Sequence, residues 1–128
     1  MKKILLAEDN PANRELLREF LQRWGYDVIE ASDGADALTK IHATLPDLVL
    51  CDIQLPVLDG FGVVQALRKD QRFTQTPVIA LTAFAMRGDK EKILSAGFNT
   101  YQSKPIESEM LKENIRRLLK QREKALNP

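Results

Sequence analysis

The sequence predicts an α/β domain built on a parallel sheet of five strands, doubly wound so that helices cover both faces. Short apolar runs alternate with longer segments whose apolar residues recur every three or four positions, as in strands alternating with helices. The first, third and fourth runs lack the in-out alternation of a half-exposed strand, which favours strands buried on both faces. The runs lie at 4–7, 28–31, 48–51, 78–81 and, more weakly, 100–102.

Five segments of helical period separate and follow these strands. Leu16, Leu17, Phe20, Leu21 and Trp24 form the most regular apolar stripe and predict an amphipathic helix. The segment 87–96 predicts a weaker, more polar helix. The other three helices are marked by apolar positions 37, 38 and 41, then 63, 64 and 67, and finally 111, 115, 118 and 119.

Residues that start and stop helices stand at the ends of these segments. Asn10 and the proline after it supply an N-cap and a first helical residue. Gly25 and Gly97 follow two of the helices as stop signals. The turn pairs Asp33-Gly34 and Asp59-Gly60 each precede a helix. These signals therefore agree with the periodicity.

The order of the strands is limited by rules of connection. Crossovers between parallel strands are right-handed, which leaves few topologies, and among these we expect the doubly wound order 2-1-3-4-5 by analogy with known five-stranded sheets. In such sheets the site forms beyond the carboxyl ends of the strands, where the winding reverses between strands 1 and 3. The residues that follow each strand are therefore the first candidates for function.

Composition limits the classes of function that fit. The chain has 128 residues, 44% hydrophobic and 29% charged, which suits one domain over 1–128 with a core at about 2–122 and a short charged tail. The net charge of +1 favours neither nucleic acid nor a membrane surface, and the apolar runs are too short to cross a bilayer. The single cysteine, Cys51, suits a reducing cytoplasm and is interpreted as a small core residue.

Chemically distinctive residues follow four of the five strands. Glu8 and Asp9 follow the first, Asp52 the third, Thr82 the fourth and Lys104 the fifth. Because parallel strands end at one edge, three carboxylates, a hydroxyl and an ammonium are expected to converge there. The simpler alternatives are local ones, namely acids that favour a helix dipole, helix caps and a surface lysine.

The convergence limits the chemistry. Neighbouring carboxylates repel, and some must take up protons unless a cation neutralises them. Mg²⁺ suits this role because it prefers oxygen ligands and often uses one or two carboxylates with water and phosphate. Asp52 would then attack phosphorus, Lys104 would bind a phosphoryl oxygen, and Thr82 would donate a hydrogen bond to another. The pattern favours phosphoryl transfer onto a carboxylate.

Four motifs at these strand ends resemble bacterial response-regulator receiver domains of the CheY-like superfamily, over nearly the whole chain. The segment 82–89 is similar to stand-alone regulators of the DivK type and to receiver modules of hybrid kinases. The resemblance implies a flavodoxin-like (βα)5 fold and a phosphoacceptor switch, not an enzyme, in two-component or phosphorelay signalling. The motifs are Leu6-Ala7-Glu8-Asp9-Asn10, Asp52-Ile53-Gln54-Leu55-Pro56 with Asp59-Gly60, Thr82-Ala83, and Lys104-Pro105.

The resemblance also implies roles for single residues. Asp52 is the implied phosphorylation site, and Thr82 and Tyr101 are the implied switch pair, although a tyrosine on an edge strand can also be mere packing. The Lys104-Pro105 peptide bond is implied to be cis. The implied ligands of Mg²⁺ or Mn²⁺ are Asp9, Asp52 and the backbone carbonyl of Gln54, with Glu8 acting mainly through water.

Partners follow from the same resemblance. The implied phosphodonor is a phosphohistidine on a sensor histidine kinase or histidine phosphotransfer protein, docked near the first helix. The implied output is a changed surface of the fourth helix, fifth strand and fifth helix, read by a downstream protein. Since the last helix uses up the chain, we expect output through a protein contact, a relay step or a partner domain.

Three positions that vary in the family bear on the metal and on phosphate lifetime. Glu8 stands where Asp is commoner, which lengthens the reach to the metal. Gln54 and Phe84 are implied to flank the phosphoryl group. We expect the bulky Phe84 to slow hydrolysis by crowding the approach of water.

Three other functions stay open at this point. A metal-dependent phosphate esterase is disfavoured because Gln54, not a carboxylate, stands two residues after Asp52. An FMN-binding protein is disfavoured because Glu8-Asp9 replaces the phosphate-binding loop it needs. A scaffold that works without phosphorylation is disfavoured by the complete acidic, threonine and lysine set.

His42 has no partner nearby in the sequence and is expected to be exposed and inert. The charges of the last helix are interpreted as a solvated face.

Overall fold

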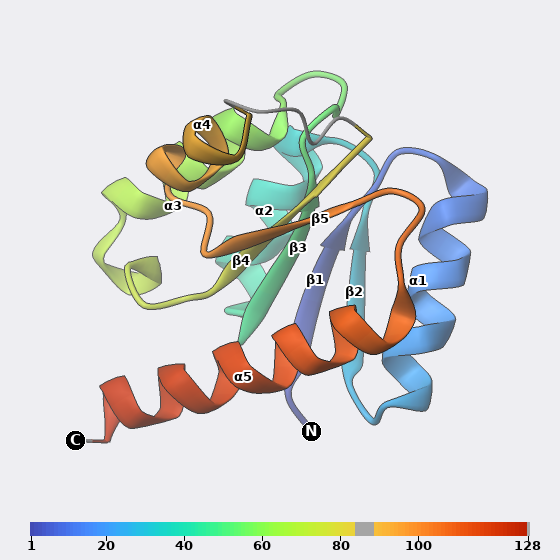
Figure 1. Ribbon diagram of the computed structural model, residues 1–128. Helices are drawn as coiled ribbons and strands as arrows, with labels where there is room; N and C mark the ends of the chain where they lie inside the picture. Colours follow the sequence, from blue (N-terminus) through green and yellow to red (C-terminus); the bar gives the residue numbers. More distant parts are fainter. Residues whose placement is uncertain (84–88, 128) are drawn as a thin grey trace.

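The computed structural model describes residues 1–83 and 89–127. It has one parallel five-stranded sheet in the order β2-β1-β3-β4-β5, as predicted, with helices on both sides (Figure 1). The strands are β1 Lys3–Ala7, β2 Asp27–Ala31, β3 Leu48–Asp52, β4 Val78–Thr82 and β5 Thr100–Ser103. The helices are α1 Pro11–Arg23, α2 Gly34–Thr44, α3 Gly60–Lys69, α4 Asp89–Ala96 and α5 Ser108–Leu126, with a 3₁₀ turn, η1, at Gln71–Phe73.

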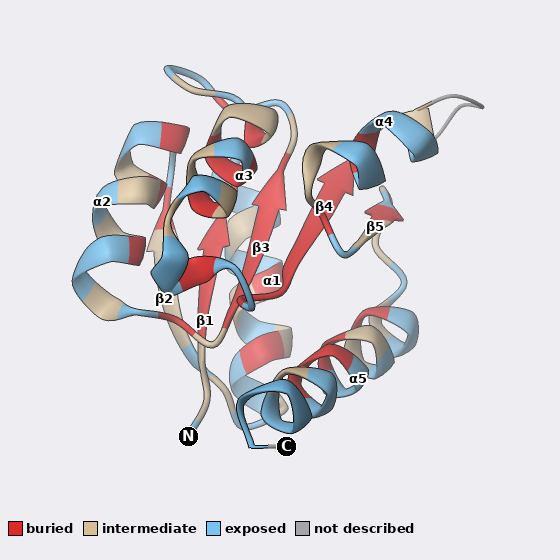
Figure 2. Cartoon of the chain, turned by 90° about the vertical axis from the view of Figure 1, so that its left-hand side faces the viewer, coloured by how far each residue is buried: buried red, intermediate tan, exposed pale blue. Residues whose placement is uncertain are grey.

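The sheet separates two apolar layers, which accounts for the continuous apolar runs. Along each of β1, β3 and β4, alternate residues point to opposite faces. Leu5, Val49 and Ala80 join a core with α2, α3 and α4, while Ile4, Leu48 and Ile79 join a second core with α1 and α5. Because both faces are covered, these central strands are buried along nearly their whole length (Figure 2).

The predicted helix signals occupy the expected places, with one refinement. The Asn10 side chain accepts from Asn13 N at 2.9 Å, and Gly25 adopts a φ of 91° after α1. Asp33 and Asp59 are themselves N-caps, so the glycine that follows each is the first helical residue and not part of a preceding turn.

Gly60 at the start of α3 allows the chain to pass close to β3. A Cβ atom at Gly60 would lie 2.6 Å from the carbonyl oxygen of Asp52, which is too close for any other residue. Gly60 N also donates to the carbonyl of Ile53 at 2.8 Å. The loop after β3 is thereby packed against the strand end that carries Asp52.

Two minor predictions have mixed outcomes. Cys51 is completely buried in the core, as predicted. His42 is exposed as predicted, but it is not without contacts: Nε2 lies 3.4 Å from Asp70 Oδ2, and its ring packs edge-on against Phe73. Asp70 is 28 positions later in the chain, so no local pattern could indicate this pair.

Within the described residues, no helix combines the length and apolarity needed to span a bilayer.

Candidate functional site at the carboxyl edge of the sheet

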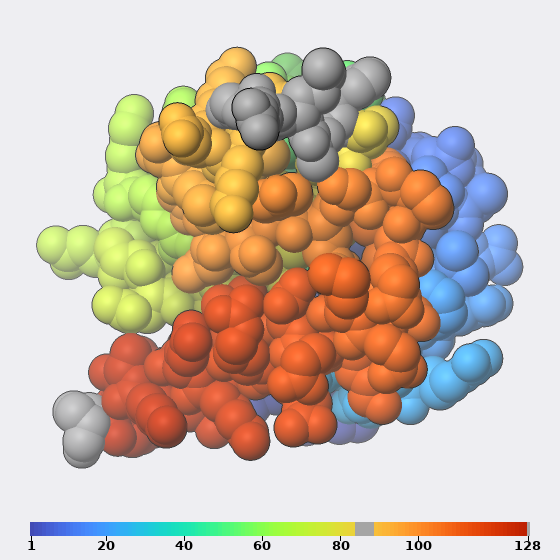
Figure 3. Space-filling view, viewed as in Figure 1, coloured from blue at the N-terminus to red at the C-terminus, as the bar shows by residue number. Residues whose placement is uncertain are grey.

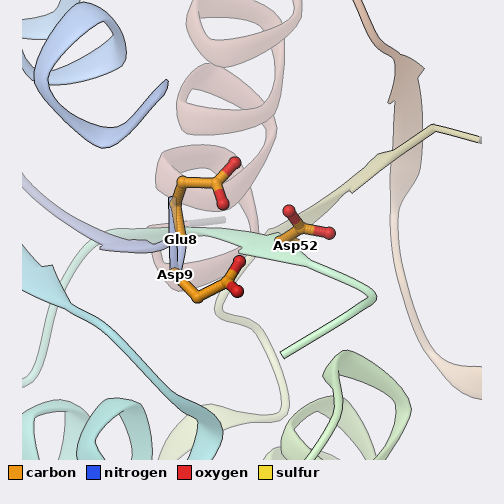
Figure 4. A group of neighbouring side chains, drawn as sticks. All are labelled: Glu8, Asp9 and Asp52. Atoms are coloured by element: carbon orange, nitrogen blue, oxygen red, sulfur yellow. The ribbon is translucent and has the colours of Figure 1, made fainter. Parts of the chain in front are cut away.

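Glu8, Asp9 and Asp52 lie together where β1 and β3 end (Figure 4). The register pairs Ala7 with Cys51, so the next residue of each strand, Glu8 and Asp52, emerges at the same level. One carboxylate oxygen from each of the three residues lies within 4.8 Å of the others. Glu8 is 0% exposed and Asp52 is 4% exposed, whereas Asp9 is open to solvent. The predicted acidic cluster is therefore present.

Lys104 reaches this cluster from the end of β5, which is separated from β3 by β4. Its backbone N–H donates to the carbonyl of Thr82 at 2.7 Å, which continues the β4–β5 pairing past the strand end. Its Nζ then lies 2.7 Å from Glu8 Oε1 and 2.5 Å from Asp52 Oδ2. The Lys104-Pro105 peptide bond is cis, the isomer that the resemblance implied.

Lys104 also neutralises charge in the cluster. The sequence predicts a metal ion for that task and Lys104 for binding the phosphoryl group. Lys104 instead contacts two of the three carboxylates directly, and they are the two buried ones. Without its own cation the protein would have to hold two uncompensated buried charges, which is costly. The cluster is therefore tolerable before any metal binds.

The pKa of Lys104 reflects the same balance. Burial lowers the pKa of this ammonium, but hydrogen bonds to Asp52 and Glu8, together with their charges, outweigh burial and raise the pKa above its ordinary value. Lys104 therefore stays charged at neutral pH.

Backbone N–H groups hold the two buried carboxylates in place. Glu8 Oε2 accepts from Asn10 N at 3.1 Å, and Asp52 Oδ1 accepts from Gln54 N at 3.0 Å. Each carboxylate thus has one oxygen on a backbone donor and the other on Lys104. These two donors were not predicted from the sequence, because a backbone N–H carries no side-chain signature. The carbonyl of Gln54 as a metal ligand stays a prediction.

The predicted switch residues lie on the two strands that follow β3 in the sheet, β4 and β5. Thr82 ends β4 and is buried, and it lines a small cavity between α3 and α4 with Gln54, Phe61 and Lys92. Tyr101 on β5 is half-buried against the core beneath α2, α3 and α4. Phe84 lies outside the described residues. Lys92 was not predicted from the sequence; its ammonium lies 5.2 Å from the centre of the Phe61 ring.

The acidic cluster fits a hard divalent cation. Its donors are carboxylate oxygens, of which Asp9 is exposed and the two buried ones are already oriented. Mg²⁺ and Mn²⁺ favour such oxygen donors, completed by water. The chemistry of the donor set, together with the separation of its oxygens, supports the predicted metal.

Comparisons with known proteins agree with this geometry. Residues 4–116 match the family model of the response regulator receiver domain. The chain is 41% identical over 118 residues to the polar-differentiation response regulator DivK of Brucella abortus and of Brucella suis, covering 92% of this chain and 96% of the relative.

Two solved structures are also similar. A putative response regulator from Chloroflexus aurantiacus is 31% identical, with a TM-score of 0.88 over 92% of this chain and 97% of that one. The receiver domain of a sensor histidine kinase from Pseudomonas aeruginosa is 37% identical, with a TM-score of 0.86 over the same shares, and holds a magnesium ion coordinated in its active site cleft. This chain belongs to the CheY-like response regulator receiver domains of two-component signalling.

Proposed function

We propose that the protein is a phosphoacceptor switch in which Asp52 takes a phosphoryl group from a phosphohistidine, with the help of Mg²⁺ or Mn²⁺. The observation that carries the proposal is the placement of Asp52: a buried carboxylate within reach of Lys104 and of two further carboxylates. A nucleophile, a fixed ammonium and a set of metal ligands are the parts that phosphoryl transfer to a carboxylate needs.

The chemical step is an in-line displacement. A bond forms between a carboxylate oxygen of Asp52 and phosphorus as the bond from phosphorus to the imidazole nitrogen breaks, and the imidazole leaves. A bound divalent cation, held by Asp9, Asp52 and the backbone carbonyl of Gln54, with Glu8 acting mainly through water, would neutralise charge on the phosphoryl oxygens. Lys104 turns from Asp52 to a phosphoryl oxygen, a short movement because its ammonium already touches that carboxylate.

The switch follows from new contacts of the phosphate. Thr82 turns inward to donate to a phosphoryl oxygen, and Tyr101 moves into the space that Thr82 leaves. This shifts a two-state equilibrium by the difference in contacts between its states. The surface of α4, β5 and α5 changes with it and is read by a downstream protein; exposed Met110, which lines a hollow together with Tyr101, is one apolar residue of that surface.

The docking site of the phosphodonor is proposed beside α1. A groove of about 440 Å³ runs between α1 and the segment before α5 and reaches the cluster at Glu8 and Lys104. Leu16 in this groove is 50% exposed, although it belongs to the apolar stripe of α1. Figure 3 shows α1, in blue, beside the chain that leads into α5, in orange. An apolar helix of a histidine kinase or phosphotransfer protein fits such a surface.

Further parts of the proposal concern the chain as a whole. We treat 1–128 as one receiver domain that acts as a switch and catalyses only its own phosphorylation and dephosphorylation. We place it in the cytoplasm, which is supported by the buried thiol of Cys51, the only cysteine of the chain. The phosphate esterase alternative predicts turnover of a chromogenic phosphate ester. The FMN-binding alternative predicts a coloured protein.

The test is incubation with acetyl phosphate and Mg²⁺, read by intact mass. Wild type should gain one phosphoryl adduct, and Asp52→Asn should gain none. Asp27→Asn is the matched control, because it makes the same change at an exposed position where β2 begins, at the opposite end of the sheet. An adduct on Asp52→Asn, or none on wild type, would overturn the assignment.

A further inference from the structure

The main chain of Glu8 is held from both sides. Its N–H donates to the carbonyl of Ala31 on β2 at 3.1 Å. Its carbonyl accepts from a guanidinium nitrogen of Arg14, Nη1, at 2.9 Å. Arg14 lies in the first turns of α1, so the helix that follows the loop reaches back and fixes the loop that carries Glu8 and Asp9.

Arg14 is itself oriented by a neighbour. Its Nε lies 3.5 Å from Glu30 Oε1 on β2, and Arg18 Nη1 lies 3.3 Å from both carboxylate oxygens of the same residue. The carbonyl of Glu30 also accepts from Lys40 Nζ at 2.7 Å. The Glu30 side chain is thus held between two arginines, of which only Arg14 contacts Glu8.

We propose that Arg14 is a positioning residue for the metal site; this inference rests on the proposed function. The carbonyl of Glu8 and the N–H of Asp9 belong to one rigid peptide plane. A guanidinium that fixes this carbonyl therefore fixes the peptide plane that joins the Cα atoms of residues 8 and 9, from which the two side chains leave the main chain. Partners of this kind, one shell outside the ligands, set the affinity of metal sites.

The sign of the effect separates positioning from plain electrostatics. Arg14 is a cation near the acidic cluster, so its charge alone opposes the binding of Mg²⁺ or Mn²⁺. If charge were its only influence, Arg14→Ala would tighten metal binding. If it positions the loop, the same substitution weakens metal binding.

The first measurement is the affinity of the whole protein for Mn²⁺, read by electron paramagnetic resonance. Arg14→Ala should bind Mn²⁺ about 10-fold more weakly than wild type, and Arg14→Lys should recover part of the loss because it keeps a donor. Arg18→Ala is the matched control, since it removes the same charge from the same helix and from Glu30 but has no bond to Glu8; its affinity should be unchanged or slightly tighter. Should Arg14→Ala fail to fold, Arg14→Met takes its place, because it keeps a long side chain but has no donor.

The proposal is overturned if Arg14→Ala binds Mn²⁺ as tightly as wild type, or if Arg18→Ala loses as much affinity.

A second readout is phosphorylation by acetyl phosphate at several Mg²⁺ concentrations. The half-saturating Mg²⁺ concentration should rise about 10-fold in Arg14→Ala, with the rate at saturating Mg²⁺ unchanged. If even wild type takes up no phosphoryl group, the proposed function fails, and the Mn²⁺ affinities still decide the role of Arg14.

Discussion

Replacing Lys104 with methionine removes a positive charge that contacts both buried carboxylates of the cluster. Glu8 is 0% exposed and Asp52 is 4% exposed, so both would be left without a cation in a poorly solvated place. Removing one partner of a buried ion pair costs about 3 to 5 kcal/mol, and we expect about 3 kcal/mol. The lower end applies because 23% of the Lys104 side chain is exposed, so water reaches this edge of the site.

That loss is large enough to measure by thermal unfolding. With an unfolding entropy of about 2.1 cal/mol/K per residue, 3 kcal/mol lowers the Tm by roughly 10 °C. Mg²⁺ should raise the Tm of Lys104→Met more than that of wild type, because the cation then meets two uncompensated carboxylates and has no ammonium to displace. Scanning calorimetry with and without Mg²⁺ measures both effects.

Lys90→Met is the matched control, because Lys90 is an exposed lysine on α4. Its Tm should stay close to that of wild type. Equal Tm values for Lys104→Met and Lys90→Met would refute the idea that Lys104 compensates buried charge. So would a Mg²⁺-induced rise in Tm no larger in Lys104→Met than in wild type.

Three further predictions concern the amino end of the sheet, the loop after β3 and the life of the phosphate. Burial raises the pKa of Asp47, but hydrogen bonds from Lys3 N and Arg122 and nearby positive charge lower it on balance. The ionised Asp47 therefore stabilises the fold above its ordinary pKa of 3.8, and this stabilisation is lost as pH falls through the lowered pKa. Asp47→Asn should therefore be less stable than wild type by about 1 kcal/mol in urea at neutral pH, and a gap that persists at pH 2 would contradict this. Gly60→Ala should slow phosphorylation by acetyl phosphate, because its Cβ would push on the strand end that carries the phosphoacceptor, and a wild-type rate would argue against the close packing. Phe84→Ala should shorten the half-life of the phosphoprotein in a mass-spectrometric time course, and an unchanged half-life would remove the idea that Phe84 crowds the attacking water.

The sequence by itself determined the elements and the edge at which function gathers. Apolar runs and helical stripes are local patterns, and right-handed crossovers leave few ways to connect them. Residues that follow neighbouring parallel strands must emerge side by side, so Glu8 and Asp52 could be placed together from the sequence alone. The same reasoning located Thr82, and the continuous apolar run of β3 located the buried Cys51.

Only the tertiary structure decided which partner each polar group found. Lys104 lies 96 positions from Glu8 and 52 from Asp52, and a flexible side chain can select among several acceptors at the edge. Its choice depends on distances set by the packing of the whole sheet. The same holds for the guanidinium of Arg14 on the carbonyl of Glu8, because a backbone carbonyl is present at every residue and only the folded geometry determines which one is used.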